Sequence, residues 1–384
     1  MKRFLCGILC VCLMMTGGLA LAEETDFSEA ELEEIREMDE VDESIYNITG
    51  KVYEEKTKED FNMDSPALYR AMQRAEFSSI YSEKIVEPKY KMVSEGQNVY
   101  EDVLYVGLQW IIVRRGKYLG YVKREWMAKN TFEALDPVNT PPMNVQKHSY
   151  IAKTAKTCHV RKTMDPFNPN VEDDGNNWVI LKPGTKITIW QFYEGWAMVN
   201  YMRSYGYIDP NELTDLIPVA PTDESLFEDS PIAAYTSYYN MAQTEKNLNR
   251  IHNIKTGCGY VSQVLQPGQE FNANKVMGPY NPRKGYLKAG VLTEGTTTLG
   301  YGGGTCQVSS TLYNVLIQLP KIQIKWRRPH GGNGASYLPI HCDAAVGNDA
   351  LNLIFVNGYD FPIQILGTSN DDGALMMRIY RVYE

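Results

Sequence analysis

The chain contains 384 residues, 43% of them hydrophobic, and its 47 acidic residues outnumber 38 lysines and arginines to give a formal net charge of −9. The length predicts two or three domains, and the hydrophobic fraction excludes a chain that is disordered throughout. Nothing in the composition resembles the basic footprint of a nucleic-acid-binding protein, so we expect no nucleic-acid partner.

The N-terminus has the pattern of a secretory signal peptide over residues 1–22. A basic start is followed by an apolar run from Phe4 to Met15 and by the small residues of a cleavage site at Ala20–Ala22. The apolar run is shorter than a membrane-spanning helix requires. We therefore expect no stable membrane insertion and a secreted or cell-wall-associated protein. Residues 23–45, rich in Asp and Glu, are expected to form an acidic spacer.

A repeat follows, and its two copies are 86 residues apart. In each copy a Trp-x-x-Val stretch predicts one strand and a Gly-Tyr-Val or Gly-Tyr-Ile stretch predicts the next. Such a pair fits a small barrel with a tryptophan against its core. The copies resemble bacterial SH3-like domains at residues 46–130 and 148–215, which implies wall-targeting modules, and Ala67–Met72 is expected to be helical. The repeated positions are Trp110, Val113, Gly120, Tyr121 and Val122, then Trp196, Val199, Gly206, Tyr207 and Ile208.

Two linkers divide the chain, one at residues 131–147 and a Pro-rich one at residues 216–231. Residues 232–384 are expected to form an α+β domain, with a strand at Ala234–Tyr239, a helix within Asn249–Val264 and a strand-rich end. The predicted fold class is therefore multidomain, with two small all-β SH3-like barrels followed by an α+β domain.

A glycine-rich stretch runs directly into Cys306 at the start of a predicted helix. Val308, Leu312 and Val315 recur at helical spacing and are expected to face a core, which leaves Cys306 on a more polar face. The positive end of the helix dipole favours a thiolate, and N–H groups there can stabilise an oxyanion. The pattern predicts an attacking cysteine, although free cysteines are commonly buried and exported cysteines commonly form disulfides.

Four cysteines follow the signal peptide, namely Cys158, Cys258, Cys306 and Cys342. An even number permits disulfides in an exported protein without proving them. His341, Cys342 and Asp343 are metal-capable neighbours, but adjacent residues on a strand point to opposite faces. We therefore expect no metal site and no cofactor.

Segments across residues 231–370 resemble the VanW family, which is named for a component of a vancomycin-resistance cluster. The resemblance implies a cell-envelope protein and leaves the reaction open. This chain has His341-Cys342-Asp343-Ala344-Ala345 where the family usually has Gly-Arg-Asp-Ala-Thr, and Cys258 and Cys342 are additional cysteines. The matching segments include Arg250-x-His252-Asn253-Ile254, Gly302-Gly303-Gly304-x-Cys306-Gln307-x-Ser309-Ser310-Thr311-Leu312-Tyr313-Asn314, Arg328-x-His330, Tyr337-x-Pro339 and Asn357-Gly358-Tyr359.

The order Cys306, His330, Asp343 suggests a nucleophile, a general base and the acid that orients it. On this hypothesis the protein is an exported thiol hydrolase or transpeptidase that acts on peptidoglycan. Residues expected to bind substrate or the oxyanion are Gly303, Gly304, Gln307, Ser309, Ser310, Tyr313, Asn314, Arg250 and His252.

The alternative is a non-catalytic protein that binds cell-wall peptide and serves glycopeptide resistance or envelope maintenance. Its glycine turn and helix start would then form an anion or peptide pocket. In that case His330 is an exposed loop residue, Asp343 caps a turn, and Arg250 and His252 pair with acids or solvent.

Overall fold

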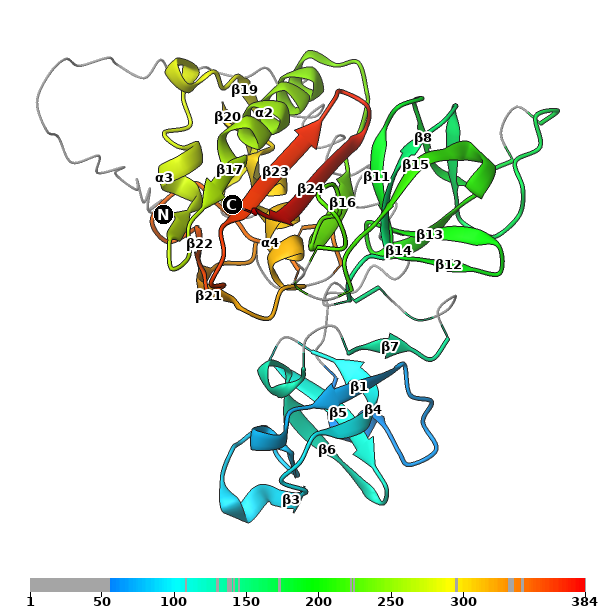
Figure 1. Cartoon of the computed structure of the whole chain (residues 1–384), viewed down its shortest axis with the longest axis vertical. Helices are drawn as coiled ribbons and strands as arrows, with labels where there is room; N and C mark the ends of the chain where they lie inside the picture. Colours follow the sequence, from blue (N-terminus) through cyan, green and yellow to red (C-terminus); the bar gives the residue numbers. More distant parts are fainter. Residues whose placement is uncertain are drawn as a thin grey trace, which may run out of the picture.

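The computed structural model describes residues 56–383 except for 108, 129–130, 137–139, 141, 144–145, 172–173, 222, 224, 294–295, 331–334 and 340–341. The predicted signal peptide and acidic spacer lie outside the described residues. The described chain forms several small antiparallel sheets with few helices, as expected for a multidomain all-β and α+β protein. Figure 1 shows three regions, which we call N-terminal (58–134), middle (150–218) and C-terminal (233–381).

The N-terminal region is one antiparallel sheet in the order β3-β2-β6-β5-β4-β1-β7. The helix expected at Ala67–Met72 is wrong, because Tyr69–Gln73 is a strand whose alternate side chains are buried and which pairs with β4. Sheet pairing outweighs the helix propensity of its Ala and Met. The elements are η1 (Lys58–Asp60), β1 (Tyr69–Gln73), η2 (Ala75–Phe77), β2 (Ser79–Tyr81), η3 (Pro88–Tyr90), β3 (Lys91–Ser94), β4 (Val99–Val106), β5 (Trp110–Arg115), β6 (Tyr118–Lys123), η4 (Arg124–Trp126) and β7 (Glu133–Ala134).

The middle region has two sheets, in the orders β10-β9-β14-β13-β12 and β11-β8-β15. Its hydrophobic core is shared with the C-terminal region, because Tyr238 and Ala374 pack among its apolar side chains. The elements are β8 (Tyr150–Thr154), β9 (Cys158–Arg161), β10 (Asn177–Leu181), β11 (Lys186–Ile189), β12 (Gln191–Tyr193), β13 (Trp196–Tyr201), β14 (Ser204–Ile208), η5 (Pro210–Glu212) and β15 (Leu213–Pro218).

The sequence repeat corresponds to one hairpin that occurs in both regions. β5 pairs with β6 so that Val113 faces Gly120, and β13 pairs with β14 so that Val199 faces Gly206. The short helices η4 and η5 follow the two hairpins at the same offset. Both glycines sit where a side chain has no room, since a Cβ on Gly120 would lie 2.5 Å from the carbonyl oxygen of Tyr81. The predicted strand pairs are confirmed, and the SH3-like assignment stays a prediction.

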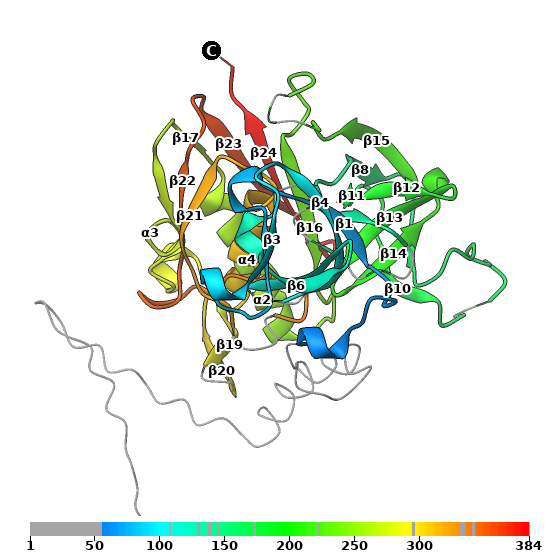
Figure 2. The same cartoon turned by 90° about the horizontal axis from the view of Figure 1, so that it is seen from below.

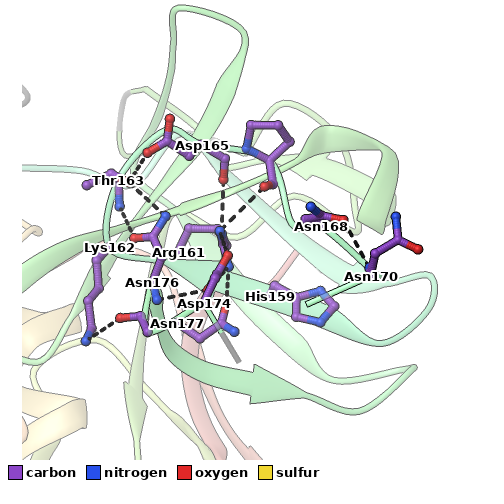
Figure 3. A network of polar contacts seen from close by, with 12 residues as sticks. His159, Arg161, Lys162, Thr163, Asp165, Asn168, Asn170, Asp174, Asn176 and Asn177 are labelled. Atoms are coloured by element: carbon purple, nitrogen blue, oxygen red, sulfur yellow. Dashed lines mark hydrogen bonds and ion pairs between the residues drawn. The ribbon is translucent and has the colours of Figure 1, made fainter. Parts of the chain in front are cut away.

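The long connection from β9 to β10 is organised by Arg161, whose side chain is buried (Figure 3). Its guanidinium donates to Asn177 Oδ1 at 2.8 Å and to both carboxylate oxygens of Asp174. Its Nε donates to the carbonyl oxygen of Asp165 at 3.0 Å. Neighbouring side chains bond to one another, as in the 2.8 Å bond from Asn176 Nδ2 to Thr163 Oγ1. The loop's polar groups are therefore largely used in holding its own shape.

The C-terminal region is an α+β unit built on the sheet β16-β24-β23-β17. Helices α2 and α4 pack on one face of this sheet, and the middle region adjoins β16 and β24 on the other (Figure 1). The elements are β16 (Ala233–Tyr238), α2 (Glu245–Val261), β17 (Gln263–Leu265), β18 (Glu270–Asn272), α3 (Ala273–Met277), η6 (Pro282–Lys284), β19 (Lys288–Thr293), β20 (Thr296–Tyr301), α4 (Thr305–Leu316), β21 (Ile322–Arg327), β22 (Leu353–Asn357), β23 (Ile363–Ser369) and β24 (Ala374–Arg381).

The N-terminal region lies beneath the other two regions, under their junction (Figures 1 and 2). Arg124 of η4 lies near the C-terminal region, where its charge acts on the thiol of Cys342. The middle region makes a different contact, in which the backbone N–H of Thr188 in β11 donates to Thr236 Oγ1 at 3.0 Å. Among the described residues, none of the helices combines the length and apolar character needed to cross a bilayer.

Replacing Gly206 by alanine is expected to lower the free energy of unfolding by about 1–3 kcal/mol, because the new methyl group would collide with Val160 Cγ1 across the sheet. Urea-induced unfolding measures the effect. The matched control is Gly259→Ala on α2, where a Cβ meets nothing within 4 Å. This substitution should stabilise the helix by about 0.5–1 kcal/mol. Equal urea midpoints for Gly206→Ala and the wild type would contradict the close packing of this hairpin.

Candidate active site

Cys306 is placed by a glycine turn that leads from β20 into α4. Gly302 and Gly304 have φ values of 84° and 105°, which glycine adopts readily. Gly303 packs so closely on the backbone of Gly290 that a Cβ would collide with it. Helix α4 then begins at Thr305, and the thiol of Cys306 lies in its first turn, partly exposed. The sequence prediction of a cysteine at a helix start is therefore confirmed.

The polar face of α4 is bonded to the segment from Cys342 to Val346. Ser310 Oγ accepts the backbone N–H of Ala344 at 2.9 Å, and Ser309 Oγ donates to the carbonyl oxygen of Ala344 at 2.5 Å. Asn314 Nδ2 donates to the carbonyl oxygen of Cys342 at 2.6 Å. These bonds are buried, so water competes little for the groups that form them. They hold Asp343, between the bonded residues, beside the first turns of α4.

His330 lies in the chain after β21 and is held by Asp343. Its backbone N–H donates to Asp343 Oδ2 at 2.8 Å, and its ring Nδ1 is 2.5 Å from the same oxygen. The ring also lies close enough to the side chain of Cys306 for the two to interact, which helps to raise the pKa of His330. Because Nδ1 faces the carboxylate, Nε2 is the nitrogen left for the sulfur. The structure thus brings Cys306, His330 and Asp343 together in the predicted order.

The Asp343 carboxylate is fully buried and has two cationic neighbours. Its Oδ2 bonds His330, while its Oδ1 has no hydrogen bond and lies 3.8 Å from Nη2 of Arg327. Arg327 also donates from Nε to the backbone carbonyl of Asp343 at 2.7 Å. Burial opposes the charge, but the hydrogen bonds and charge of His330, with the charge of Arg327, outweigh it and lower the pKa of Asp343. The carboxylate is therefore charged at neutral pH.

His330 is charged for the complementary reason. Burial disfavours the imidazolium, but hydrogen bonds with Asp343 and Cys306 and the negative charge of both partners outweigh it and raise the pKa of His330 to about 10. At neutral pH the site consequently holds an imidazolium between the sulfur of Cys306 and a carboxylate. His330 is in a loop, as the alternative reading expected, but only 12% of its side chain is exposed.

Three further groups border the sulfur. Burial and, second, the interaction with Cys306 raise the pKa values of both Tyr280 and Tyr337, which indicates that their side chains lie near the sulfur. Val346 presents its backbone N–H 3.5 Å and its carbonyl oxygen 3.4 Å from Cys306 Sγ. The sequence analysis did not assign these residues to the site. The Tyr337-x-Pro339 motif was the one available signal, since nothing local marks Tyr280 or Val346.

The other predicted site residues occupy different positions. Gln307 is buried, where its Nε2 donates to Ser237 Oγ and to the carbonyl of Tyr238, each at 2.9 Å. Its Oε1 accepts a 2.7 Å bond from Arg250, whose charge also reaches Tyr337. Tyr313 packs under the guanidinium of Arg327. His252 is exposed and donates to the carbonyl of Gly285, along a separate shallow pocket shared with Lys255 and Asp371.

None of the four cysteines from Cys158 onward is in a disulfide in the described chain. Cys158, Cys258 and Cys342 are buried, and burial raises the pKa of each thiol. Cys306 differs because it is partly exposed. His341 lies outside the described residues, and within the part described no group of His, Cys, Asp and Glu side chains is arranged to hold a metal ion.

A partly exposed cysteine at a helix start, joined to a histidine that a buried carboxylate holds, marks the C-terminal region as a candidate thiol-enzyme domain with an α+β fold. Residues 249–380 match the family model described as "VanW like protein". The resemblance expected from the motifs is confirmed for this region, which is similar to VanW proteins.

Two individual proteins are similar to this chain. "Uncharacterized protein YoaR" of Bacillus subtilis (strain 168) is 27% identical over 242 residues, which are 63% of this chain and 76% of that protein. A solved structure titled "Structure of NlpC1 from Trichomonas vaginalis" aligns with 84% of this chain and 95% of that chain, at 10% identity and a TM-score of 0.17. A score this low does not indicate a common fold.

NMR titration of the His330 ring should show a pKa far above the usual 6.5, about 10. Its stabilising contribution is then complete below pH 6.5 and is lost as the pH rises through 10. Asp343→Asn should lower the pKa of His330, because the variant loses the carboxylate charge that offsets the effect of burial on the imidazolium. The control is Asp371→Asn, which removes an exposed carboxylate paired with Lys255 and should leave the His330 titration unchanged. A wild-type midpoint near 6.5 would contradict the charged pair.

Proposed function

We propose that the C-terminal region is a thiol enzyme that hydrolyses or transfers an amide bond of cell-wall peptides. The observation that carries the proposal is the contact of Cys306 with His330 and of His330 with buried Asp343. The match of residues 249–380 to the VanW-like family model supports a setting in the cell envelope. Export through the N-terminal signal, and SH3-like wall targeting by the N-terminal and middle regions, are parts of the same proposal.

The reaction follows from the charges in the site. The Cys306 thiolate attacks the amide carbonyl and forms a C–S bond, and the oxygen takes up the negative charge. As the C–N bond breaks, the His330 imidazolium gives its proton to the leaving amine. The neutral imidazole then takes a proton from water, or from an acceptor amine, as it attacks the thioester. The product acid or new amide leaves, and the thiolate–imidazolium pair is restored.

The oxyanion needs N–H donors close to the sulfur. The N–H groups of Thr305 and Gln307 already donate to the carbonyls of Gly302 and Gly304, each at 3.0 Å. We therefore assign the oxyanion to the N–H groups of Cys306 and Val346. The Val346 N–H is 3.5 Å from Sγ, within reach of an oxygen on a carbon bound to that sulfur. Tyr280 and Tyr337 would flank the substrate on either side of its reacting carbonyl.

Iodoacetamide alkylation of the folded protein, followed by peptide mass mapping, tests the nucleophile. Cys306 should react while Cys158, Cys258 and Cys342 react only after unfolding, because they are buried and serve as internal controls. His330→Ala should slow the alkylation of Cys306 at pH 7 by about tenfold or more, since the thiolate loses the imidazolium beside it. Unreactive Cys306 in the folded protein would remove the nucleophile.

Digestion of peptidoglycan fragments, followed by mass spectrometry, tests the reaction. Wild type should yield products with a cleaved or exchanged amide bond, and Cys306→Ser should yield almost none, with a fall in rate of about a thousandfold or more. The Cys258→Ser variant changes a buried thiol outside the site and is the matched control. If Cys306→Ser still binds the fragments and wild type leaves them intact, the region is a binding module.

A further inference from the structure

A second site lies on the face of the C-terminal sheet that is turned away from α4. On β24, Met377 and Ile379 pack into the core that contains α4. Successive side chains of a strand point to opposite faces of the sheet, so Arg378 and Tyr380 lie on the face away from α4. Their cross-strand neighbours on β23 are Leu366 and Gln364. These four residues and the segment 225–229 line a cavity of about 890 Å³. The cavity is large enough for a small organic ligand.

Arg378 is buried in this cavity with most of its hydrogen-bonding capacity unused. The residue is only 7% exposed, and one N–H, on Nη1, donates to Tyr380 Oη at 3.3 Å. Its Nε and Nη2 are both buried and have no hydrogen-bond partner in the described structure. These two nitrogens form one edge of the guanidinium, which is the edge that grips a carboxylate or phosphate through two parallel bonds.

The charges nearby do not compensate Arg378. Lys186 of β11 is close enough that burial and the charge of Arg378 together lower its pKa, so a second cation adjoins the first. Glu228 and Asp229 line the cavity but are exposed to solvent. Neither carboxylate forms a hydrogen bond with Nε or Nη2 of Arg378 in the described structure. A buried guanidinium without an acidic partner is costly, and a bound anion would remove that cost.

The lining also contains Arg381 and three large hydrophobic or aromatic side chains that are exposed. Leu226, Phe227 and Tyr383 are exposed by 55%, 48% and 53% at the edge of the same cavity. Large side chains exposed together beside a buried charge are typical of a binding site. The anion would enter with an apolar or aromatic portion that covers these side chains.

We propose that this cavity binds the carboxylate or phosphate group of a ligand with an attached apolar or aromatic part, held by the Nε–Nη2 edge of Arg378. The site is independent of the reaction proposed for Cys306, because α4 and Arg378 lie on opposite faces of the sheet. Its failure and the failure of the thiol reaction are therefore distinguishable.

Isothermal titration of the full mature chain with benzoate and with phenyl phosphate tests the proposal and separates a carboxylate source from a phosphate source. At least one should bind, and Arg378→Met should weaken it by about tenfold or more, because a charge-assisted pair of bonds is lost. Arg283→Gln, an exposed arginine on η6, is the matched control and should bind as wild type does. Cys306→Ser should also bind normally.

A thermal unfolding scan in anion-free buffer guards against misfolding of the variant. Arg378→Met should have an unfolding midpoint equal to or above that of wild type, since it removes an unpaired buried charge and keeps a side chain of similar length. A markedly lower midpoint would show that Arg378 is paired within the protein and would overturn the proposal. So would equal binding by Arg378→Met and wild type, or no binding of either anion.

Discussion

The bonds between the polar face of α4 and the segment from Cys342 to Val346 are the contact on which the site depends. Ser310 accepts from the N–H of Ala344 while Asn314 donates to the carbonyl of Cys342. The peptide groups on both sides of Asp343 are thereby fixed, and its side chain can point in only a narrow range of directions. Each of these buried groups would cost about 1–3 kcal/mol if left without a partner, so the segment cannot slide along the helix cheaply.

Fixing Asp343 would be unfavourable if its charge stood alone. The carboxylate is fully buried, yet it touches His330 on one oxygen and approaches Arg327 near the other. The buried carboxylate therefore has two positive groups beside it. The interactions of His330 with Asp343 and Cys306 explain why the pKa of His330 is raised although burial acts against its charge. The imidazolium that the chemistry requires is therefore also the group that makes the carboxylate tolerable in the protein interior.

Much of this arrangement was predictable because it is local. The helical spacing of Val308, Leu312 and Val315 indicated which face of α4 enters the core, and that left Cys306 near a polar surface. The repeated hairpins were visible because their glycines and aromatics are required at matching positions. The order of Cys306, His330 and Asp343 suggested that they act together. It could not show that they are close in space, because that depends on the path of the intervening loops.

The features of the fold and site that could not be predicted from the sequence depend on tertiary contacts. Ala67–Met72 has good helix formers, but pairing with β4 decides its structure. The pKa of Tyr280 responds to Cys306, which lies 26 residues later in the chain, and no local pattern marks this proximity. Gln307 is adjacent to the nucleophile in sequence, yet its amide nitrogen donates to β16 and its amide oxygen accepts from Arg250. Proximity along a helix thus says little about proximity at the site.

Comparison of Arg378 on β24 with Asp343 shows why each buried polar residue has to be judged separately. On β24, alternation puts Met377 and Ile379 against α4 and turns Arg378 to the opposite face. An apolar residue at position 378 would satisfy the fold as well or better, since Arg378 has two buried nitrogens without partners. Asp343 differs, because His330 and Arg327 compensate the charge of its carboxylate and its hydrogen bonds hold His330 in place. A charge that the structure compensates can be explained by the structure alone, whereas the charge of Arg378 is explained only by something that binds to it.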